Sequence, residues 1–471
     1  MVKIFGHSVP GPKLLLAFCE IILLSIALAI FTLPTLEASV DYLGELRSVI
    51  AFSLAPSALG TTAMIAVGLY NYDVLVDFRL TAIKMVVALI LVAPLICLGL
   101  LLLADTVSGI AGGWFAWYSK MVLIWVLSLV VTRTAFLKFA AVEVFKRRVV
   151  VVGNGELAAR ILRRGEQAAD CHFTVVAFID ACIDPPKVEG TDVVLGNMID
   201  WETFASFVRR HRAREVVVAT NNRRSFFVQQ LLSCKMDGVN IVDYQSFWER
   251  ESCRLDLDAL QSSGEIFSDG FHTGIFVNVM MKRSFDIIVT MAMLILTSPV
   301  MLATAILIKL ESDGPILYRQ NRVGMGGRTF SLLKFRSMHV GAEGLNDPQW
   351  ARVNDSRVTR VGSVIRKLRI DELPQLLNVL RNHMSFIGPR PERPYFVERF
   401  CREIPFYSQR HLVKPGITGW AQIRYPYGAS QEDARQKLSY DLYYIKNQTL
   451  FLDLIILIET VRIILFPSGV R

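Results

Sequence analysis

The chain has 471 residues, of which 52% are hydrophobic and only 20% charged, and its mean hydropathy of +0.40 is too high for a purely soluble protein. Its formal net charge of +9 suits an anionic lipid surface or phosphorylated substrates. Nucleic acid is not an expected partner, because no zinc-ligand spacing, RNP-like run or basic helix with a zipper occurs. The seven cysteines are dispersed without a CxxC pair, which argues against a disulfide framework.

Four long apolar blocks open the chain, at residues 14–33, 49–70, 80–103 and 114–139. Each is close to the ~20 residues that a membrane-spanning helix needs. Lysines precede the first block and basic residues at 146–148 follow the fourth, so the positive-inside rule places both ends in the cytoplasm. We therefore expect residues 1–145 to form a transmembrane four-helix bundle whose first span is retained rather than cleaved.

The composition changes at Arg147, where "RRVVVVGNGELAARIL" predicts a valine strand, a glycine turn and a helix. Gly153 and Gly155 fit the G-x-G-x-x-A pattern of a first βα turn, and Asp180 ends the next strand, where a ribose-binding acid is expected. "DVVLG" and "EVVVA" continue the alternation of a parallel sheet. Residues 146–250 are thus predicted to form a Rossmann-like α/β domain. Two readings of its glycine turn remain, a nucleotide site and a turn kept for packing.

Residues 251–281 are mixed in character, and we expect a linker there. An apolar run at 285–310 is long enough to cross a bilayer, but Ser298 and Pro299 interrupt its centre and basic residues flank both ends. Proline removes a helical hydrogen bond and forces a bend. The pattern favours a re-entrant membrane helix at about 284–310 that returns to the cytoplasmic face; a kinked spanning helix is the alternative.

The last apolar stretch, at about 450–466, is short and is interrupted by Asp453, Glu459 and Arg462. It is typical of an interfacial helix that lies on the membrane. Packing against the rest of the protein is the alternative.

The densest group of reactive side chains lies in "VTRVGSVIRKLRIDELPQLLNVLRNHMSFIGPRPERP", at 358–394. Asp371 and Glu372 stand just before Pro374, which is tolerated only in the first turn of a helix, so Asp371 is expected near a helix N-cap. Two adjacent carboxylates among cations and glycines suit metal-assisted phosphoryl chemistry. They do not suit a glycosidase pair, which flanks the sugar from opposite faces, and no P-loop sequence is present.

Basic and polar side chains surround this pair in the sequence. Prolines on both sides of Arg390 would hold its guanidinium in a fixed direction, as a bidentate phosphate clamp needs. The candidates for binding phosphate or substrate are Arg319, Gln320, Arg322, Lys334, Arg336, Arg366 and Arg390.

Residues 282–471 resemble the bacterial sugar-transferase family of polyprenyl-phosphate phosphoglycosyl transferases. The matching stretches, in chain order, are "KRSFDI", "SP", "GPILYRQNRVG", "KFRSM", "RVTRVGSVIR", "DELPQLLNVL", "GPRP" and "PGITGWAQ". The preceding spans and Rossmann-like domain resemble the large members of that family, which initiate exopolysaccharide or O-antigen synthesis. "AQIRYPYGAS" departs from the glycine-arginine that commonly follows "AQ" and resembles an exosortase-associated subgroup, while His383 stands where an acidic residue is usual.

The resemblance implies an α-rich monotopic catalytic domain at 282–471, in the bacterial inner membrane with its active site on the cytoplasmic face. It implies transfer of a hexose-1-phosphate from a UDP-sugar to undecaprenyl phosphate, with release of UMP and a covalent intermediate. Asp371 would be the nucleophile, and Glu372 would position it or Mg²⁺, with both carboxylates as metal ligands. Lys334, Arg336, Arg366 and Arg390 would neutralise phosphates, and Gln422 would border the nucleotide. Inner-membrane lipid, other polysaccharide-assembly proteins and a second copy of the chain are further expected partners.

Two other functions were considered. A membrane-anchored, NAD-dependent nucleotide-sugar epimerase or dehydratase usually needs a Tyr-x-x-x-Lys pair, and none of the thirteen tyrosines has a lysine four residues on. A non-catalytic assembly scaffold would leave the Asp371, Lys334 and Arg390 group without a purpose. The transferase is therefore the favoured hypothesis, with the identity of the sugar left open.

Overall fold

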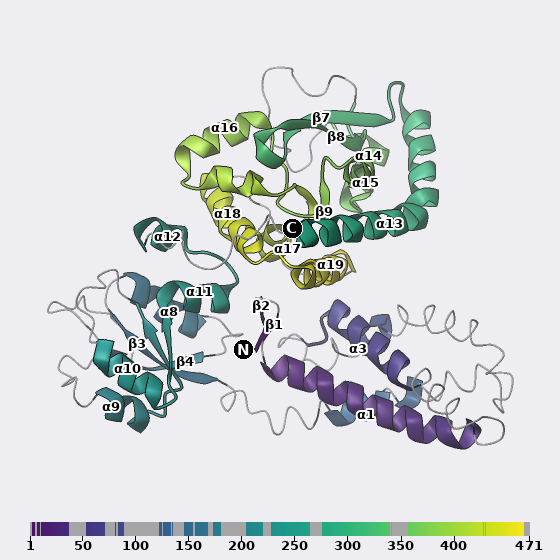
Figure 1. The fold of residues 1–471 in the computed structure, drawn as a ribbon. Helices are drawn as coiled ribbons and strands as arrows, with labels where there is room; N and C mark the ends of the chain where they lie inside the picture. Colours follow the sequence, from purple (N-terminus) through teal and green to yellow (C-terminus); the bar gives the residue numbers. More distant parts are fainter. Residues whose placement is uncertain are drawn as a thin grey trace. The chain divides into compact units, whose positions relative to one another are not determined.

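The computed structural model describes residues 2–4, 7–9, 11–36, 53–70, 146–153, 156–167, 173–179, 204–219, 228–263, 276–339, 357–426 and 430–465, and also 81, 83–88, 122–124, 126–132, 134, 341 and 428. The chain forms two compact units, one over Met1–Glu251 and one over Ser252–Ile463. Figure 1 shows their elements.

The N-terminal unit begins with an antiparallel pair of short strands, β1 (Val2–Ile4) and β2 (His7–Val9). Two apolar helices follow, α1 (Gly11–Leu36) and α3 (Ala55–Val67), and they pack on each other. The buried carboxylate of Glu20 in α1 accepts hydrogen bonds from Tyr70 and, at 3.2 Å, from Thr132. Most of the third and fourth apolar blocks lie outside the described residues, so the four-helix bundle stays a prediction.

The second part of this unit is a four-stranded parallel sheet in the order β4-β3-β5-β6, which confirms the predicted α/β domain. Gly153 follows β3 with φ 135°, a conformation that glycine adopts without strain, and its N–H donates to Ile179 O at 2.8 Å. Gly155 and Asp180 lie outside the described residues. The elements are β3 (Arg147–Val152), α8 (Glu156–Gln167), β4 (Phe173–Ile179), α9 (Phe204–Arg210), β5 (Glu215–Val218), α10 (Val228–Met236), β6 (Asn240–Asp243) and α11 (Tyr244–Ser252).

The second unit is mostly helical, with one long antiparallel hairpin of β7 and β8 and a short parallel pair of β9 and β10. Its elements are α12 (Leu257–Ser263), α13 (Phe276–Glu311), β7 (Leu317–Val323), η5 (Met325–Gly327), β8 (Thr329–Phe335), α14 (Arg360–Lys367), η6 (Ile370–Glu372), α15 (Gln375–Leu380), β9 (Ser385–Ile387), α16 (Pro394–Glu403), η7 (Tyr407–Leu412), β10 (Gly416–Thr418), α17 (Trp420–Arg424), α18 (Gln431–Lys446) and α19 (Leu450–Leu465).

Part of the segment expected to be a linker packs into this second unit. Leu255 and Leu257 lie in its hydrophobic core, and the N–H of Leu255 donates to Ser439 O at 3.0 Å. The indole of Trp420 donates to Cys253 O at 2.8 Å. Residues 252–263 therefore belong to the second unit, and the boundary between the two units falls directly after Glu251.

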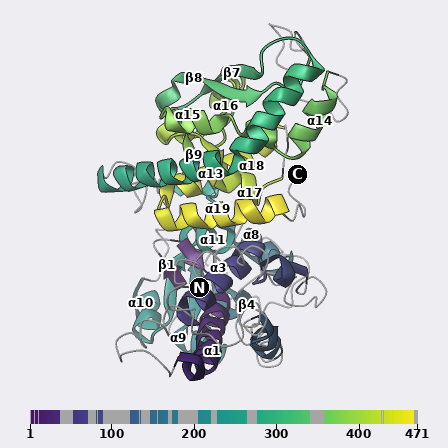
Figure 2. The same cartoon turned by 90° about the vertical axis from the view of Figure 1, so that its right-hand side faces the viewer.

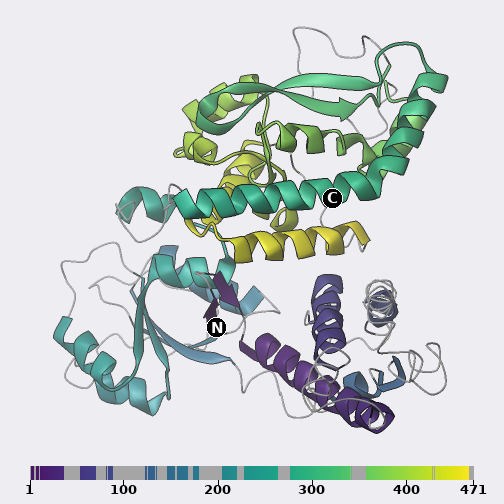
Figure 3. The same ribbon diagram turned by 45° about the vertical axis from the view of Figure 1, so that its right-hand side comes forward.

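Helix α13 is long, apolar and sharply bent. Within the described residues, Val279–Glu311 is the one helix long and apolar enough to cross a membrane, and shorter apolar helices occur at Leu14–Ile30 and Val122–Thr132. Figure 3 shows two arms of α13 that meet at an elbow. Pro299 lies inside the helix, and the hydroxyl of Ser298 donates to Ile295 O at 2.9 Å, which satisfies a carbonyl beside the break. Pro299 and Ser298 thus give α13 a local cause for a bend.

Helix α19 runs beside the N-terminal arm of α13, as Figures 1 and 2 show. The carboxylate of Asp453 is fully buried, 2.9 Å from the ammonium of Lys282 on α13. Leu452 and Ile456 are also buried, whereas Leu454 is exposed on the other side. The charge that seemed to interrupt this apolar stretch is therefore paired inside the protein.

Candidate active site

The Asp371–Glu372 pair lies in a tight turn between two helices. Helix α14 ends at Lys367, Arg369 adopts a left-handed conformation with φ 59°, and the 3-10 turn η6 carries both carboxylates. Pro374 then occupies the N-cap of α15. The expectation that Asp371 lies near the N-cap is therefore wrong, because Pro374, whose fixed φ fits the start of a helix, takes that position and Asp371 precedes it by three residues.

Glu372 is the centre of a cationic cluster. Its Oε1 accepts hydrogen bonds from Lys334 Nζ and Arg390 Nη2, each at 2.9 Å, and Arg369 Nη1 lies 3.8 Å away. Burial alone would raise the pKa of this carboxyl, but the three cations hold it well below its ordinary value. Glu372 is thus a fixed anion that orients Lys334 and Arg390.

Asp371 has the opposite surroundings. Its side chain is 8% exposed, and among the described residues none forms a hydrogen bond or ion pair with its carboxylate. Burial and the neighbouring negative charge of Glu372 raise its pKa, while Lys334, Arg369 and Arg366 oppose that shift. An unpaired carboxylate close to cations that it does not bind is chemically available as a nucleophile or metal ligand.

The β7–β8 hairpin places its candidates differently. Lys334 on β8 reaches Glu372, and burial lowers the pKa of its ammonium. Arg322 on β7 donates to Gln320 Oε1 at 3.0 and 2.6 Å and to Pro391 O at 3.0 Å, and burial lowers its pKa to about 10. Side chains alternate along a strand, so the exposed Arg319 lies on the face opposite to Gln320 and Arg322.

Arg336 serves the fold instead. Its side chain is 6% exposed, and its guanidinium donates to the backbone carbonyls of Asp313 at 2.8 Å, Ser312 at 2.7 Å and Ile308 at 3.4 Å. These carbonyls end helix α13 and begin the turn after it, where cations are favoured by the helix dipole. Arg336 thus caps the C-terminal arm of α13.

The remaining candidates lie near the pair or apart from it. Arg366, half-buried on α14, is one of the cations whose charge opposes the burial-driven rise of the Asp371 pKa. Gln422 on α17 donates to Ile417 O at 3.2 Å, and its Oε1 is buried without a hydrogen-bond partner in the part of the chain that the structure describes. That orphaned acceptor is consistent with a polar ligand close by.

Three polar residues near the pair are not among the candidates from the sequence: Arg369, Arg410 and Asp441. Arg410 and Asp441 are 31 residues apart in the chain yet form a buried ion pair at 2.8 Å. The only sequence signal was a charged residue at an otherwise apolar position, which does not identify its partner.

A divalent cation fits this site only together with a substrate. Among the described residues no three His, Cys, Asp or Glu side chains group as a metal site. Mg²⁺ typically binds one or two carboxylates and takes its other ligands from water and substrate phosphates. Asp371 and the Oε2 atom of Glu372, which forms no hydrogen bond with a described residue, are two such ligands.

Comparison with known proteins assigns the two halves separately. Residues 277–467 match the bacterial sugar transferase family model, and residues 65–242 match the model of a CoA-binding domain. The second match overlaps the four-stranded sheet and supports its Rossmann-like assignment.

Three relatives illustrate the similarity. A UDP-N-acetylgalactosamine-undecaprenyl-phosphate N-acetylgalactosaminephosphotransferase of Aeromonas hydrophila is 56% identical over 190 residues, 40% of this chain and 45% of that protein. A UDP-glucose:undecaprenyl-phosphate glucose-1-phosphate transferase of Caulobacter vibrioides is 44% identical over 182 residues, 38% of this chain and 68% of the relative. An undecaprenyl-phosphate galactose phosphotransferase of Salmonella typhimurium is 28% identical over 347 residues, 69% of this chain and 70% of the relative. The first of these matches spans less than half of the relative's length.

Proposed function

This chain belongs to the bacterial sugar transferase family, and from that premise we propose that it transfers a sugar 1-phosphate from a UDP-sugar to undecaprenyl phosphate. UMP would leave, and the undecaprenyl diphosphate sugar would be the first lipid-linked intermediate of an exopolysaccharide or O-antigen. The single observation that carries the proposal is the contrast between Asp371, which is unpaired among the described residues, and Glu372, which holds two cations.

The reaction has two balanced displacements. In the first, a carboxylate oxygen of Asp371 attacks the β-phosphorus of the UDP-sugar, and the bond from that phosphorus to the bridging oxygen breaks, so UMP carries away the electron pair. In the second, a phosphate oxygen of undecaprenyl phosphate attacks the same phosphorus and the Asp371 carboxylate leaves. A covalent intermediate lets one site receive two different substrates in turn.

The neighbouring side chains stabilise charge during both steps. Lys334 and Arg390 are held by Glu372 within 2.9 Å, and a preorganised cation beside developing negative charge is worth more than one that must be drawn in. Arg369 and Arg366 precede Asp371 in the chain, and their charges oppose the rise of its pKa that burial and Glu372 cause. Asp371 and Glu372 would hold Mg²⁺ with the diphosphate, and the ion would neutralise the phosphate oxygens.

The bent helix α13 supports a re-entrant placement on the membrane. A straight helix of 36 residues would span ~54 Å. Instead, Arg283 near its start donates to Val379 O and Leu380 O at 2.7 and 2.9 Å, and Glu311 at its end accepts from the N–H groups of Arg360 and Val361 at 2.8 and 3.2 Å.

Both ends of α13 are therefore fastened to one segment, residues 360–380, which also carries Asp371. A helix that crossed the bilayer would have its ends on opposite sides and could not make both attachments to that segment. With UDP-sugars in the cytoplasm, this arrangement favours the cytoplasmic face of the bacterial inner membrane. A homodimer and other polysaccharide-assembly proteins stay expectations, as does the exosortase-associated subgroup.

The test is UMP release by the full-length protein in lipid nanodiscs. Undecaprenyl phosphate, Mg²⁺ and a panel of UDP-glucose, UDP-galactose, UDP-N-acetylglucosamine and UDP-N-acetylgalactosamine would be supplied, because the relatives act on different sugars. Asp371→Asn should abolish turnover and the phosphosugar adduct seen by intact-mass spectrometry. The matched control is Asp313→Asn, an exposed aspartate in the turn after α13. An Asp371→Asn variant that still forms the adduct would move the nucleophile elsewhere.

A further inference from the structure

The loop that carries Arg390 is held by its backbone. Residues 389–393 have prolines at 389 and 391, and the four successive carbonyls of residues 389–392 accept hydrogen bonds from other elements. The N–H of Gly416 donates to Pro389 O at 2.9 Å. Arg410 donates to Arg390 O at 2.9 Å, Arg322 donates to Pro391 O at 3.0 Å, and the N–H of Val323 donates to Glu392 O at 3.0 Å. Two of these donors are the side chains of Arg322 and Arg410, and the other two are backbone N–H groups.

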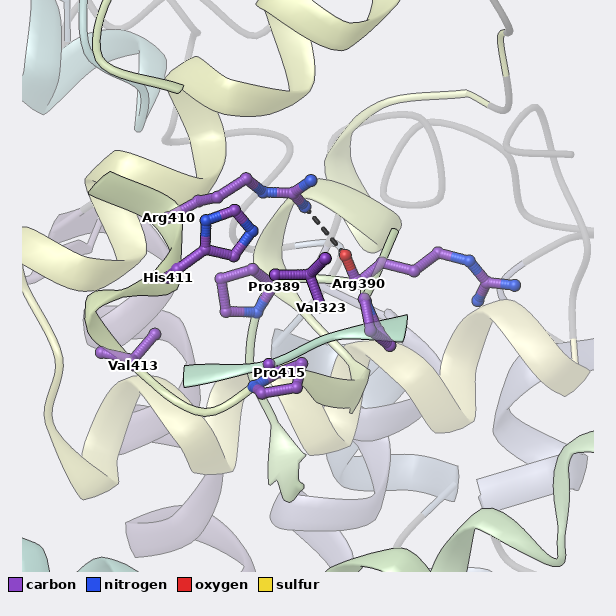
Figure 4. A pocket seen from close by; sticks show the side chains of 9 residues that line it. Val323, Pro389, Arg390, Arg410, His411, Val413 and Pro415 are labelled. Carbon is purple, nitrogen blue, oxygen red and sulfur yellow. Dashed lines mark hydrogen bonds between the residues drawn. The ribbon is translucent and has the colours of Figure 1, made fainter. Parts of the chain in front are cut away.

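Arg410, on the 3-10 helix η7, contacts this loop from outside it. Its guanidinium donates to Tyr407 OH at 2.7 Å and to Asp441 Oδ2 at 2.8 Å, in addition to Arg390 O. Figure 4 shows the Arg390 side chain extending away from Arg410 while its carbonyl oxygen receives the bond. The side chain of Arg390 continues to Glu372, 2.9 Å from its Oε1. A continuous chain of contacts thus runs from Asp441 through Arg410 and the backbone of Arg390 to Glu372.

Asp441 and Arg410 are expensive groups to bury. Their side chains are 2% and 7% exposed, and a buried ion pair often adds nothing to stability over well-packed hydrophobic residues. Burial raises the pKa of Asp441 to about 6, although the charge of Arg410 opposes this. Stability alone does not favour this pair. Because the guanidinium of Arg410 also donates to Arg390 O, the pair suggests a role in positioning the loop.

We propose that Arg410 and Asp441 are positioning residues, which fix the Arg390 backbone so that its guanidinium meets Glu372 and the phosphates beside Asp371. Neither residue touches the reacting atoms. The inference rests on the proposed function, because it gives this pair a role in that reaction. A misplacement of about 1 Å at such a group costs on the order of 10²-fold in rate.

The first experiment is a double-mutant cycle on the full-length protein in nanodiscs, with UMP release as the readout. Arg410→Gln and Asp441→Asn each remove the buried pair, and Arg390→Lys keeps a cation but loses the planar fork. Arg410→Gln alone should lower kcat by on the order of 10²-fold. In the Arg390→Lys background it should lower kcat little further, because its effect is transmitted through Arg390. If the pair only stabilised the fold, the fold-losses in kcat of Arg410→Gln and Arg390→Lys would multiply in the double variant.

The second experiment is hydrogen–deuterium exchange, which needs no activity. Arg410→Gln and Asp441→Asn should raise amide exchange in the peptide covering 386–396. The matched control is Arg336→Gln, because Arg336 is equally buried and also donates to backbone carbonyls, but at the end of α13. Arg336→Gln should raise amide exchange at 308–316 and leave exchange at 386–396 unchanged. Its fold-loss in kcat, if any, should multiply with that of Arg390→Lys, because the two act independently. Melting temperatures identify any variant that has lost its fold. If either Arg410→Gln or Asp441→Asn fails to fold, the other still tests the pair.

The outcomes are distinct. The proposal is supported if amide exchange at 386–396 rises and if Arg410→Gln lowers kcat little further in the Arg390→Lys background. Unchanged exchange there, or losses that multiply, would overturn it while the transferase assignment stands. If the wild-type protein released no UMP with any sugar, the proposed function would fail, and the positioning role with it. The exchange experiment would then still report whether Arg410 holds the loop.

Discussion

Asp371 and Glu372 are neighbours in the chain and differ in what holds them: Glu372 accepts hydrogen bonds from Lys334 and Arg390, and no described residue pairs with Asp371. Their pKa values move in opposite directions, lowered well below the ordinary value for Glu372 and raised for Asp371. Environments that separate two carboxyl pKa values typically separate two catalytic roles.

The first prediction concerns pH. Burial and then the Glu372 charge raise the pKa of Asp371, and only its ionised form attacks, so activity should fall as pH decreases through that raised pKa. Glu372→Gln removes the neighbouring negative charge and should shift the acid limb of kcat/KM to lower pH while reducing the plateau rate. The profile of UMP release against pH is the measurement. An acid limb that stays in place or moves to higher pH would assign it to another group.

The second prediction compares Lys334 with Arg319. Lys334→Met removes a cation 2.9 Å from Glu372 and should lower kcat by ~10²-fold, as loss of one charge-stabilising donor does. Arg319→Met removes an exposed cation on the other face of β7 and should cost no more than about fivefold. Steady-state UMP release measures both. Equal losses would place Arg319 in the site after all.

The third prediction separates stability from catalysis at Arg336. Arg336→Ala leaves the carbonyls of Ile308, Ser312 and Asp313 without the donor that holds them and should lower the free energy of unfolding by on the order of 2–4 kcal/mol. Thermal melting in detergent is the measurement, and exposed Arg328→Ala is the control. If Arg336→Ala melts like the wild type but loses activity, Arg336 binds substrate.

The fourth prediction tests the elbow of α13. The double variant Ser298→Ala/Pro299→Leu restores a helical N–H donor and should straighten the helix. A single cysteine at exposed Met325, in a background without the native cysteines, should be labelled only from the cytoplasmic side in the wild type and from the periplasmic side in the double variant. Val300→Leu, on the same turn, is the control that keeps the proline. Periplasmic labelling in the wild type would reject the re-entrant placement.

The fifth prediction is that residues 252–471 retain UMP release. The start is set by Cys253 and Leu255, which bond to Trp420 and Ser439 and would be lost in a truncation at Lys282. The Caulobacter relative supports independence, since its matched 182 residues make up 68% of its length. The same truncation carrying Asp371→Asn is the control. A folded but inactive truncation would give the N-terminal half a part in catalysis.

Local patterns gave the strands, the bent helix and the carboxylate pair. Valine runs after Arg147 have a strong strand preference, and the resulting parallel sheet is confirmed. A bend in this helix could be predicted from the central Ser298–Pro299 pair because the effect of proline on backbone bonding is local. Asp371 was found from one short motif, but its position relative to the helix was wrong by three residues.

Pairings between distant residues could not be read from the sequence. Arg336 looked like a phosphate ligand because the positions of the α13 carbonyls depend on tertiary packing. Asp453 looked like a charge facing the headgroups because its partner Lys282 is 171 residues away, and only the fold brings them within 2.9 Å. Leu255 and Leu257 looked like linker because their burial depends on distant residues of α18 and on Trp420 at the start of α17.

On the re-entrant placement proposed above, the double attachment of α13 should make the transfer rate depend on bilayer thickness. Arg283 and Glu311 attach the two arms to residues 360–380, and Pro299 lies between these two residues in the helix. A membrane thicker or thinner than the arms changes their tilt, at a cost of a fraction of a kcal/mol per Å of mismatch. Because Arg283 and Glu311 attach both ends of α13 to residues 360–380, a change in tilt should strain the turn that carries Asp371. Lipid chain length should then change the geometry around Asp371, the proposed nucleophile, so the transfer rate should pass through an optimum as the acyl chains are lengthened.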